Sequence, residues 1–239
     1  MSGVLAVVAH PDDETLIAGG VLARCAQNGV PARVLCLTRG ELGGGEDPQR
    51  TAGLREQELA RATAELGAEA ECLRHPDGEL PWADVDAVAD EVAARIEAQR
   101  PDVVVTFGED GLYHHPDHVA TNAIVLEAAR RCGDPAVACA VWPTGHMTAL
   151  VAAARERGVA SDLWGLEPEA FGSVDAGRLV AVDVRPQLDR KLRALRCHAS
   201  QFGTGHLLFD LPSDLAGEYL GWEFFEPGGG ERIAEVAGQ

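Results

Sequence analysis

The sequence predicts one α/β domain over residues 1–239: a Rossmann-like, doubly wound domain with a mostly parallel sheet and its site at the carboxyl ends of the strands. Two observations predict this class. Segments of strand length alternate with longer stretches of helical periodicity, and the strand segments are apolar at nearly every position. Continuous apolar strands are typical of a parallel sheet covered on both faces. With 46% apolar residues, a chain of this length suffices for a single core.

The expected elements follow in order along the chain. Residues 4–9, 13–27 and 32–38 predict a first strand–helix–strand unit, in which Asn28-Gly29 ends the helix. The later expected strands are 71–74, 101–107, 136–142 and 179–184, and the later expected helices are 50–66, 82–99, 117–131, 147–157 and 187–198. The end of the chain has no regular pattern, and the glycines at 228–230 predict a frayed terminus.

Charge and cysteine content exclude several functional classes. Lys and Arg number 20 against 38 Asp and Glu, a net charge of -18, so nucleic acid is not an expected partner. The chain has no signal-peptide pattern and no apolar run of membrane-spanning length. The six cysteines form no Cys-x-x-Cys pair, so we expect buried free thiols and a cytoplasmic protein.

Two polar segments that begin with His-Pro-Asp follow the predicted strands 4–9 and 101–107, and a third copy, at 75–77, follows the strand 71–74. His-Pro-Asp-Asp-Glu at 10–14 follows the first strand directly, and His-Pro-Asp-His at 115–118 follows the 101–107 strand after a short loop. Ligands bind at the carboxyl ends of such strands, and these two strands are expected to be neighbours in the sheet. Helix capping explains either segment alone, but the two together predict a functional site.

The residue types in these segments fit a catalytic metal site. Catalytic zinc typically takes three protein ligands from His, Asp and Glu and keeps one position open. His10, Asp13 and His118 meet this demand, because His10 and Asp13 lie three residues apart at a helix start and can face one ion. We expect Zn²⁺, although the same ligand types also accept iron, cobalt or manganese.

Asp12, His115 and Asp117 are the expected catalytic residues of this site. Asp12 is not one of the three expected ligands. A carboxylate beside a metal can act as general base towards water that the metal acidifies. His115 is expected to polarise the carbonyl group or to protonate the leaving nitrogen. Asp117 is expected to orient His115 as its hydrogen-bonding partner.

These motifs resemble the PIG-L/LmbE-like family of zinc-dependent N-deacetylases, which includes N-acetylglucosaminyl-phosphatidylinositol, mycothiol-pathway and bacillithiol-pathway deacetylases. The similar segments are Ala-His-Pro-Asp-Asp-Glu at 9–14, Thr-Arg-Gly-Glu at 38–41, Asp77-Gly78, His-Pro-Asp-His at 115–118, and Lys191 with His-Ala-Ser-Gln at 198–201. The resemblance implies the same fold, metal ligands and general base. It also implies that a sugar is bound by Glu41, Arg55, Asp77 and Tyr113.

We therefore expect a hydrolase that removes the N-acetyl group from an N-acetylglucosamine-type unit of a small metabolite. A mycothiol S-conjugate amidase and a tailoring deacetylase of natural-product synthesis are alternatives, as is a sugar-binding module without catalysis. A dinucleotide-binding module is disfavoured, because acidic residues and not Gly-x-Gly-x-x-Gly follow the first strand. The sequence leaves open whether the chain forms homo-oligomers and what His114, His146, His198 and residues 142–171 do.

Overall fold

Seven strands form one mixed sheet in the computed structural model, which describes residues 3–159, 161–203 and 205–239. Their order in the sheet is β3-β2-β1-β4-β5-β7-β6. The strands are β1 (Val4–Val8), β2 (Ala32–Thr38), β3 (Glu69–His75), β4 (Val103–Phe107), β5 (Val137–Ala140), β6 (Val180–Asp183) and β7 (Trp222–Phe225). Strands β1 to β5 run parallel, whereas β7 is antiparallel to β5 and β6. The predicted doubly wound class and the pairing of β1 with β4 are confirmed.

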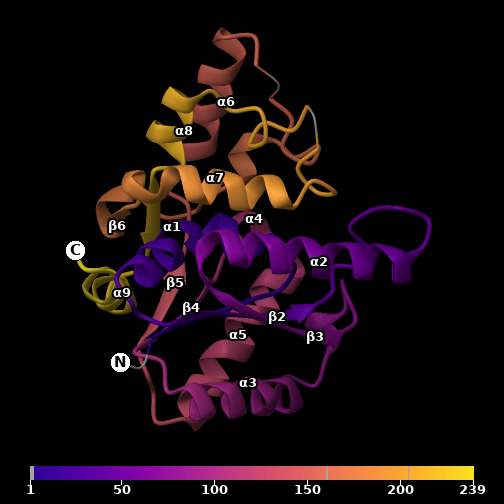
Figure 1. Cartoon of the computed structure of the whole chain (residues 1–239), viewed down its shortest axis with the longest axis vertical. Helices are drawn as coiled ribbons and strands as arrows, with labels where there is room; N and C mark the ends of the chain where they lie inside the picture. The colour runs from indigo at the N-terminus through magenta and orange to yellow at the C-terminus, as the bar shows by residue number, and fades with distance from the viewer. Residues whose placement is uncertain (1–2, 160, 204) are drawn as a thin grey trace.

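Helices cover both faces of this sheet (Figure 1). They are α1 (Asp13–Gln27), α2 (Pro48–Leu66), α3 (Val85–Gln99), α4 (Gly111–His114), α5 (Pro116–Arg131), α6 (His146–Glu156), α7 (Leu188–Cys197), α8 (Ser213–Tyr219) and α9 (Gly229–Ala237), with 3-10 turns η1 (Leu80–Trp82), η2 (Pro168–Ala170), η3 (Ala176–Arg178) and η4 (Arg185–Gln187). Helices α1, α2 and α7 lie together on one face, and α3 packs beside α5 on the other. Helices α6 and α8 pack on each other beyond α7, at the top of Figure 1.

Local sequence explains how the elements around the site begin. Strand β1 is buried at all five positions, as its continuous apolar run requires of a strand covered on both faces of a parallel sheet. The Asp47 carboxylate caps α2 by accepting the N–H groups of Gln49 and Arg50. Both α2 and α5 have proline in the first turn, where the missing N–H costs no hydrogen bond.

The end of the chain forms a strand and a helix, so the expectation of a frayed terminus at 228–230 is wrong. Strand β7 lies between β5 and β6, and its Phe225 side chain is fully buried. Helix α9 then packs against β5 and buries Ile233. This contact requires glycine, because a Cβ on Gly229 would lie 1.8 Å from the Val137 carbonyl oxygen.

A buried ion pair joins the C-terminal part of the chain to α1. Lys191 Nζ lies 2.7 Å from Glu223 Oε1, and the two side chains are 5% and 2% exposed. The same carboxylate accepts the backbone N–H groups of Gly20 and Val21 in the middle of α1. Position 20 also requires glycine because α1 lies close to Val184: a Cβ on Gly20 would be 2.3 Å from Cβ of Val184.

The structure also bears on the expectations from composition. The six cysteines are free thiols, as expected, but only Cys25, Cys36 and Cys139 are buried, and the other three are partly exposed. Burial raises the pKa of the Cys25 thiol to about 12, which keeps this group protonated and unreactive. Within the described ranges, no helix has both the length and the apolar character needed to cross a bilayer.

Candidate metal and catalytic site

Three side chains from two strand ends converge at the carboxyl edge of the sheet. His10 and Asp13 follow β1 at the start of α1, and His118 lies in the first turn of α5, after β4. His118 Nε2 lies 3.3 Å from His10 Nδ1 and 3.2 Å from Asp13 Oδ1. Asp13 Oδ2 lies 3.4 Å from His10 Nδ1. All three residues are buried.

The outward-facing nitrogens of the two histidines have hydrogen-bond partners of their own. His10 Nε2 lies 3.0 Å from Asp117 Oδ2 and 3.1 Å from Asp77 Oδ1. His118 Nδ1 lies 3.1 Å from the Gly111 carbonyl oxygen, which can only accept. These partners favour protons on the outward nitrogens. The lone pairs of His10 Nδ1 and His118 Nε2 are therefore directed at the space shared with Asp13.

The distances between these side chains fit a metal ion. Zinc with nitrogen and oxygen ligands at about 2.0–2.1 Å in tetrahedral geometry separates its ligand atoms by about 3.4 Å. The two histidine nitrogens are 3.3 Å apart, and they lie 3.2 and 3.4 Å from one or the other oxygen of the Asp13 carboxylate. Ligand atoms of His10, Asp77 and Asp117 also lie within 4.8 Å of one another. There, however, the carboxylates approach the protonated Nε2 of His10, and they serve that ring as hydrogen-bond acceptors.

Asp12 precedes α1, but its carboxylate makes no capping hydrogen bond within the described part of the chain. The side chain is 11% exposed, and one oxygen lies 3.2 Å from Arg55 Nη2. Burial raises the pKa of Asp12 to about 6, against the opposing charge of Arg55 and with the help of Asp13. The carboxylate is therefore available beside the three converging side chains.

His115 is the residue before α5 and lies next to both proposed histidine ligands. Its ring centroid is 4.9 Å from that of His10 and 4.6 Å from that of His118. His115 Nδ1 accepts the backbone N–H of Asp117 at 3.2 Å, so the neutral ring carries its proton on Nε2. Burial and the neighbouring imidazoles lower the pKa of His115 to about 4. At neutral pH the ring is thus a hydrogen-bond donor without charge.

The Asp117 carboxylate is directed at His10 and away from His115. Besides His10, it accepts the backbone N–H groups of Gly78 at 2.8 Å and Leu80 at 3.2 Å. The expectation that this carboxylate orients His115 is therefore wrong, because only the backbone N–H of Asp117 contacts that ring. Asp117 is in the first turn of α5, where its N–H points back at the capping residue while its side chain reaches the β3–η1 loop.

A cavity of about 420 Å³ opens beside these residues. Its lining consists of His10, Asp12, Asp13, Leu16, Leu42, Gly43, Arg55, Asp77, Gly78, Tyr113, His115, Trp164, Leu166 and Gln201. Three of the four expected sugar-binding residues, Arg55, Asp77 and Tyr113, therefore line it. Glu41 does not line it directly: its Oε1 accepts the backbone N–H of Asp77 at 3.0 Å, and its buried Oε2 has no hydrogen-bond partner in the described ranges.

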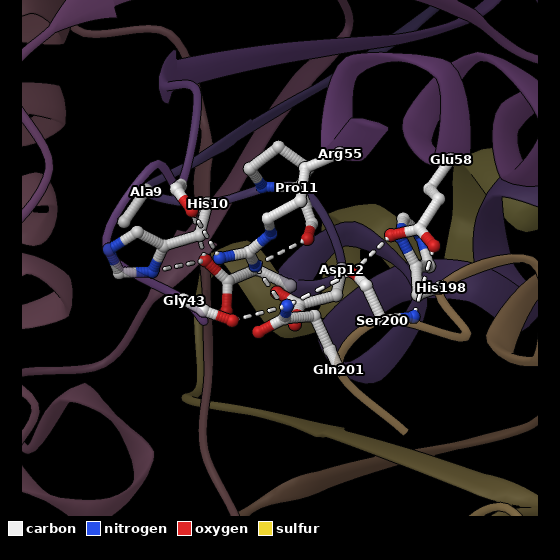
Figure 2. A network of polar contacts seen from close by, with 12 residues as sticks. Ala9, His10, Pro11, Asp12, Gly43, Arg55, Glu58, His198, Ser200 and Gln201 are labelled. Atoms are coloured by element: carbon white, nitrogen blue, oxygen red, sulfur yellow. Dashed lines mark hydrogen bonds and ion pairs between the residues drawn. The ribbon is translucent and has the colours of Figure 1, made fainter. Parts of the chain in front are cut away.

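Arg55 lines the cavity, but its guanidinium is largely engaged by the backbone. It donates to the carbonyl oxygens of Gly40 at 2.9 Å and Pro11 at 2.8 Å, and it lies beside the Asp12 carboxylate (Figure 2). The side chain is 4% exposed. The guanidinium therefore holds the loops around Asp12 together, and few of its N–H groups remain for a hydrogen bond to a sugar.

The sequence did not assign several lining residues to the site. Trp164 stacks near Tyr113 with ring centroids 6.0 Å apart, and with Leu166 it forms an apolar wall of the cavity. The sequence left the role of residues 142–171 open and did not place these two side chains at the site. Gln201 donates to the Gly43 carbonyl oxygen at 2.8 Å (Figure 2), and the His-Ala-Ser-Gln motif at 198–201 was its only signal.

The three histidines whose roles the sequence left open have different positions. His114 is exposed and does not line the cavity. His146 lies in α6, where its Nε2 is 2.9 Å from the Tyr219 carbonyl oxygen. His198 follows α7, is fully buried, and lies with its Nε2 2.8 Å from Glu14 Oε1.

Known proteins resemble this chain over most of its length. The chain is 36% identical to the 1D-myo-inositol 2-acetamido-2-deoxy-alpha-D-glucopyranoside deacetylase of Rhodococcus opacus (strain B4), over 83% of this chain and 81% of that protein. It is 35% identical to the protein of the same name from Rhodococcus jostii (strain RHA1), over 97% and 94% of the two chains. The solved structure of the A40926 pseudoaglycone deacetylase Dbv21 has the same fold, with a TM-score of 0.68, 22% identity and coverage of 95% and 96%.

The family model of GlcNAc-PI de-N-acetylase (PIG-L) matches residues 5–129. This range contains both His-Pro-Asp segments at 10–14 and 115–118. The chain therefore belongs to the GlcNAc-PI de-N-acetylase family of deacetylases, which are amide hydrolases.

Proposed function

We propose that this protein is a zinc-dependent N-deacetylase that removes the acetyl group from an N-acetylglucosamine-type unit of a small metabolite. The observation that carries this proposal is the convergence of His10 Nδ1, Asp13 and His118 Nε2 next to the Asp12 carboxylate, which does not cap α1. The two Rhodococcus relatives are named for a 2-acetamido sugar joined to inositol, which makes that compound the first substrate to test.

His10, Asp13 and His118 would hold the metal, since their inward atoms have the spacing of a tetrahedral ligand set. When bound, zinc supplies Lewis-acid chemistry, which polarises the amide carbonyl and acidifies water. Asp77 and Asp117 hold the His10 ring in place through its Nε2.

The remaining steps use side chains of the protein. Asp12 accepts a proton from water as the water oxygen forms a bond to the amide carbon. His115 Nε2–H donates a hydrogen bond to the carbonyl oxygen as that oxygen becomes negative. Protonated Asp12 then gives its proton to the sugar nitrogen, the C–N bond breaks, and acetate and the free amine leave.

The cavity suits an amino sugar in size and chemistry. Its volume of about 420 Å³ lies within the usual range for a small-molecule site. The hydroxyl of Tyr113 and the amide of Gln201 offer hydrogen bonds to sugar hydroxyls, and Trp164 offers an apolar face for a ring.

A substrate panel with metal control tests the proposal. The purified protein is analysed for metal, treated with a chelator, and reloaded with zinc, iron, cobalt or manganese. Each form is assayed for amine released from N-acetylglucosaminyl-inositol, N-acetylglucosamine, an acetylated glycopeptide and a mycothiol S-conjugate. We expect fastest release from the inositol conjugate, loss of activity on chelation and recovery with zinc. Preference for the S-conjugate would favour the amidase, and absence of both metal and turnover would favour a sugar-binding module.

A further inference from the structure

Asp12 has a backbone conformation that few residues with a side chain adopt. Its φ is 136° and its ψ is -29°. Such angles persist in a protein only when the surrounding groups hold them. The preceding Pro11 has its φ fixed by the pyrrolidine ring, so the orientation of the Pro11–Asp12 peptide plane decides where the Asp12 side chain starts.

Charged side chains of opposite sign hold both ends of this peptide. Arg55 Nη2 donates to the Pro11 carbonyl oxygen at 2.8 Å (Figure 2). Glu14 Oε2 accepts the Asp12 N–H at 3.0 Å. Half a turn of the peptide plane would direct the carbonyl oxygen at the carboxylate and the N–H at the guanidinium. Both contacts therefore oppose the alternative orientation, and they do so in a buried environment where charges act strongly.

Glu14 is in turn held by a residue from the far end of the chain. His198 Nε2 lies 2.8 Å from Glu14 Oε1, and both side chains are 0% exposed. The Thr15 hydroxyl donates to the same oxygen at 2.6 Å. Burial opposes protonation of His198, but Glu14 outweighs it and raises the pKa of His198. Neither Glu14 nor His198 belongs to the described lining of the cavity, so they can affect the reaction only through other residues.

We propose that Glu14 and His198 are positioning residues for the general base. Together with Arg55 they fix the Pro11–Asp12 peptide, and this orientation aims the Asp12 carboxylate at the reacting water. The inference rests on the proposed function, since it requires Asp12 to be the base. It also assigns Arg55 to Asp12 and the backbone, where family resemblance had implied a sugar-binding role.

Replacing Glu14 tests this inference directly. The inositol conjugate of the Rhodococcus relatives, or the best substrate of the panel, is used as probe. Glu14→Ala is expected to lower kcat by about 100-fold through displacement of the base, with KM within about threefold and metal content unchanged. Glu14→Gln should recover most of kcat, because its amide oxygen still accepts the Asp12 N–H. His198→Ala should lower kcat by about tenfold, since Glu14 keeps its own bond to Asp12 but loses its anchor.

Glu223→Gln is the matched control. Glu223 is also a buried carboxylate that accepts backbone N–H groups of α1 and pairs with a buried cation, but it does not line the cavity. We expect Glu223→Gln to lower Tm and to leave kcat within about twofold. Two outcomes would show that Glu14 and His198 have only a structural role. Either their alanine variants lower Tm without lowering kcat, or kcat falls in proportion to the metal content.

A crystal structure of Glu14→Ala gives a readout independent of turnover. The Asp12 φ is expected to leave the positive range, and an unchanged φ would overturn the inference. Asp12→Ala in the same assay separates the two proposals. If Asp12→Ala stays active, the proposed base is wrong; if it is inactive while Glu14→Ala is active, only the positioning role fails.

Discussion

Residues 3–140 and residues 141–239 contribute different parts of the cavity. The first part contains the parallel strands β1 to β5 and every ionisable side chain in the described lining. The second part contains the antiparallel pair β6–β7 and irregular segments, and it lines the cavity with Trp164, Leu166 and Gln201. The ionisable side chains of the lining therefore lie at the strand ends of the parallel sheet, and the second part adds two apolar side chains and an amide. Under the proposed function, we expect the reaction to take place at the first part and the second part to add contacts with the substrate.

Asp12→Ala is the substitution with the largest expected effect, and it tests the role of the first part. Loss of the general base should lower kcat by about 1,000-fold. Metal content should stay at the wild-type level, because the three proposed ligands are intact. Steady-state kinetics and elemental analysis of the same preparation measure both quantities. If Asp12→Ala retained most of the activity, the first part of the chain would not supply the general base, and the comparison would be wrong.

Trp164→Ala tests the role of the second part, with a smaller effect on a different constant. Removal of the apolar wall beside Tyr113 should raise KM by about tenfold, or about 1.4 kcal/mol, and change kcat much less. Trp82→Ala is the matched control, since Trp82 is 79% exposed and does not line the cavity. A fall in kcat without a change in KM would mean that Trp164 affects the reaction and not substrate binding, which would contradict the comparison.

Gly20→Ala tests the packing contact between the two parts and should not change kcat. The added Cβ would lie 2.3 Å from Cβ of Val184, so overpacking should destabilise the fold by about 1–3 kcal/mol. Gly53→Ala, in α2, is the control, because a Cβ there meets nothing within 4 Å and alanine favours a helix. Thermal unfolding should show a lower Tm for Gly20→Ala only. Equal Tm values for the two variants would mean that Val184 can move away from the added Cβ without a loss of stability.

The same division describes how far the sequence predicts the structure. In the first part, apolar runs such as 4–9 and 101–107 specify buried parallel strands, and their order brings the two His-Pro-Asp segments together. In the second part, β7, α8 and α9 were missed. The glycines at 228–230, where α9 begins, are typical of loops, and both β7 and α9 depend on contacts with strand β5, far away in the sequence.

Within the site, residue types and spacing predicted which side chains lie together but not which atoms meet. The Asp117 carboxylate contacts His10 because of the path of the β3–η1 loop, which no local pattern specifies. Arg55 was expected at a sugar, whereas it binds two backbone carbonyl groups that lie in two separate loops, after β1 and after β2. Contacts of this kind follow from tertiary packing and are absent from any short motif.

The distance in sequence between Glu14 and His198 has a consequence for synthesis of the chain. All three proposed metal ligands are translated by residue 118, whereas His198 and Gln201 come near the end. On the ribosome, β1 can pair with β4 and bring the ligands together while the support of Asp12 is still missing. The residues proposed to hold the ion are therefore synthesised well before the residue that supports Asp12 through Glu14, and we expect the proposed base to be positioned last.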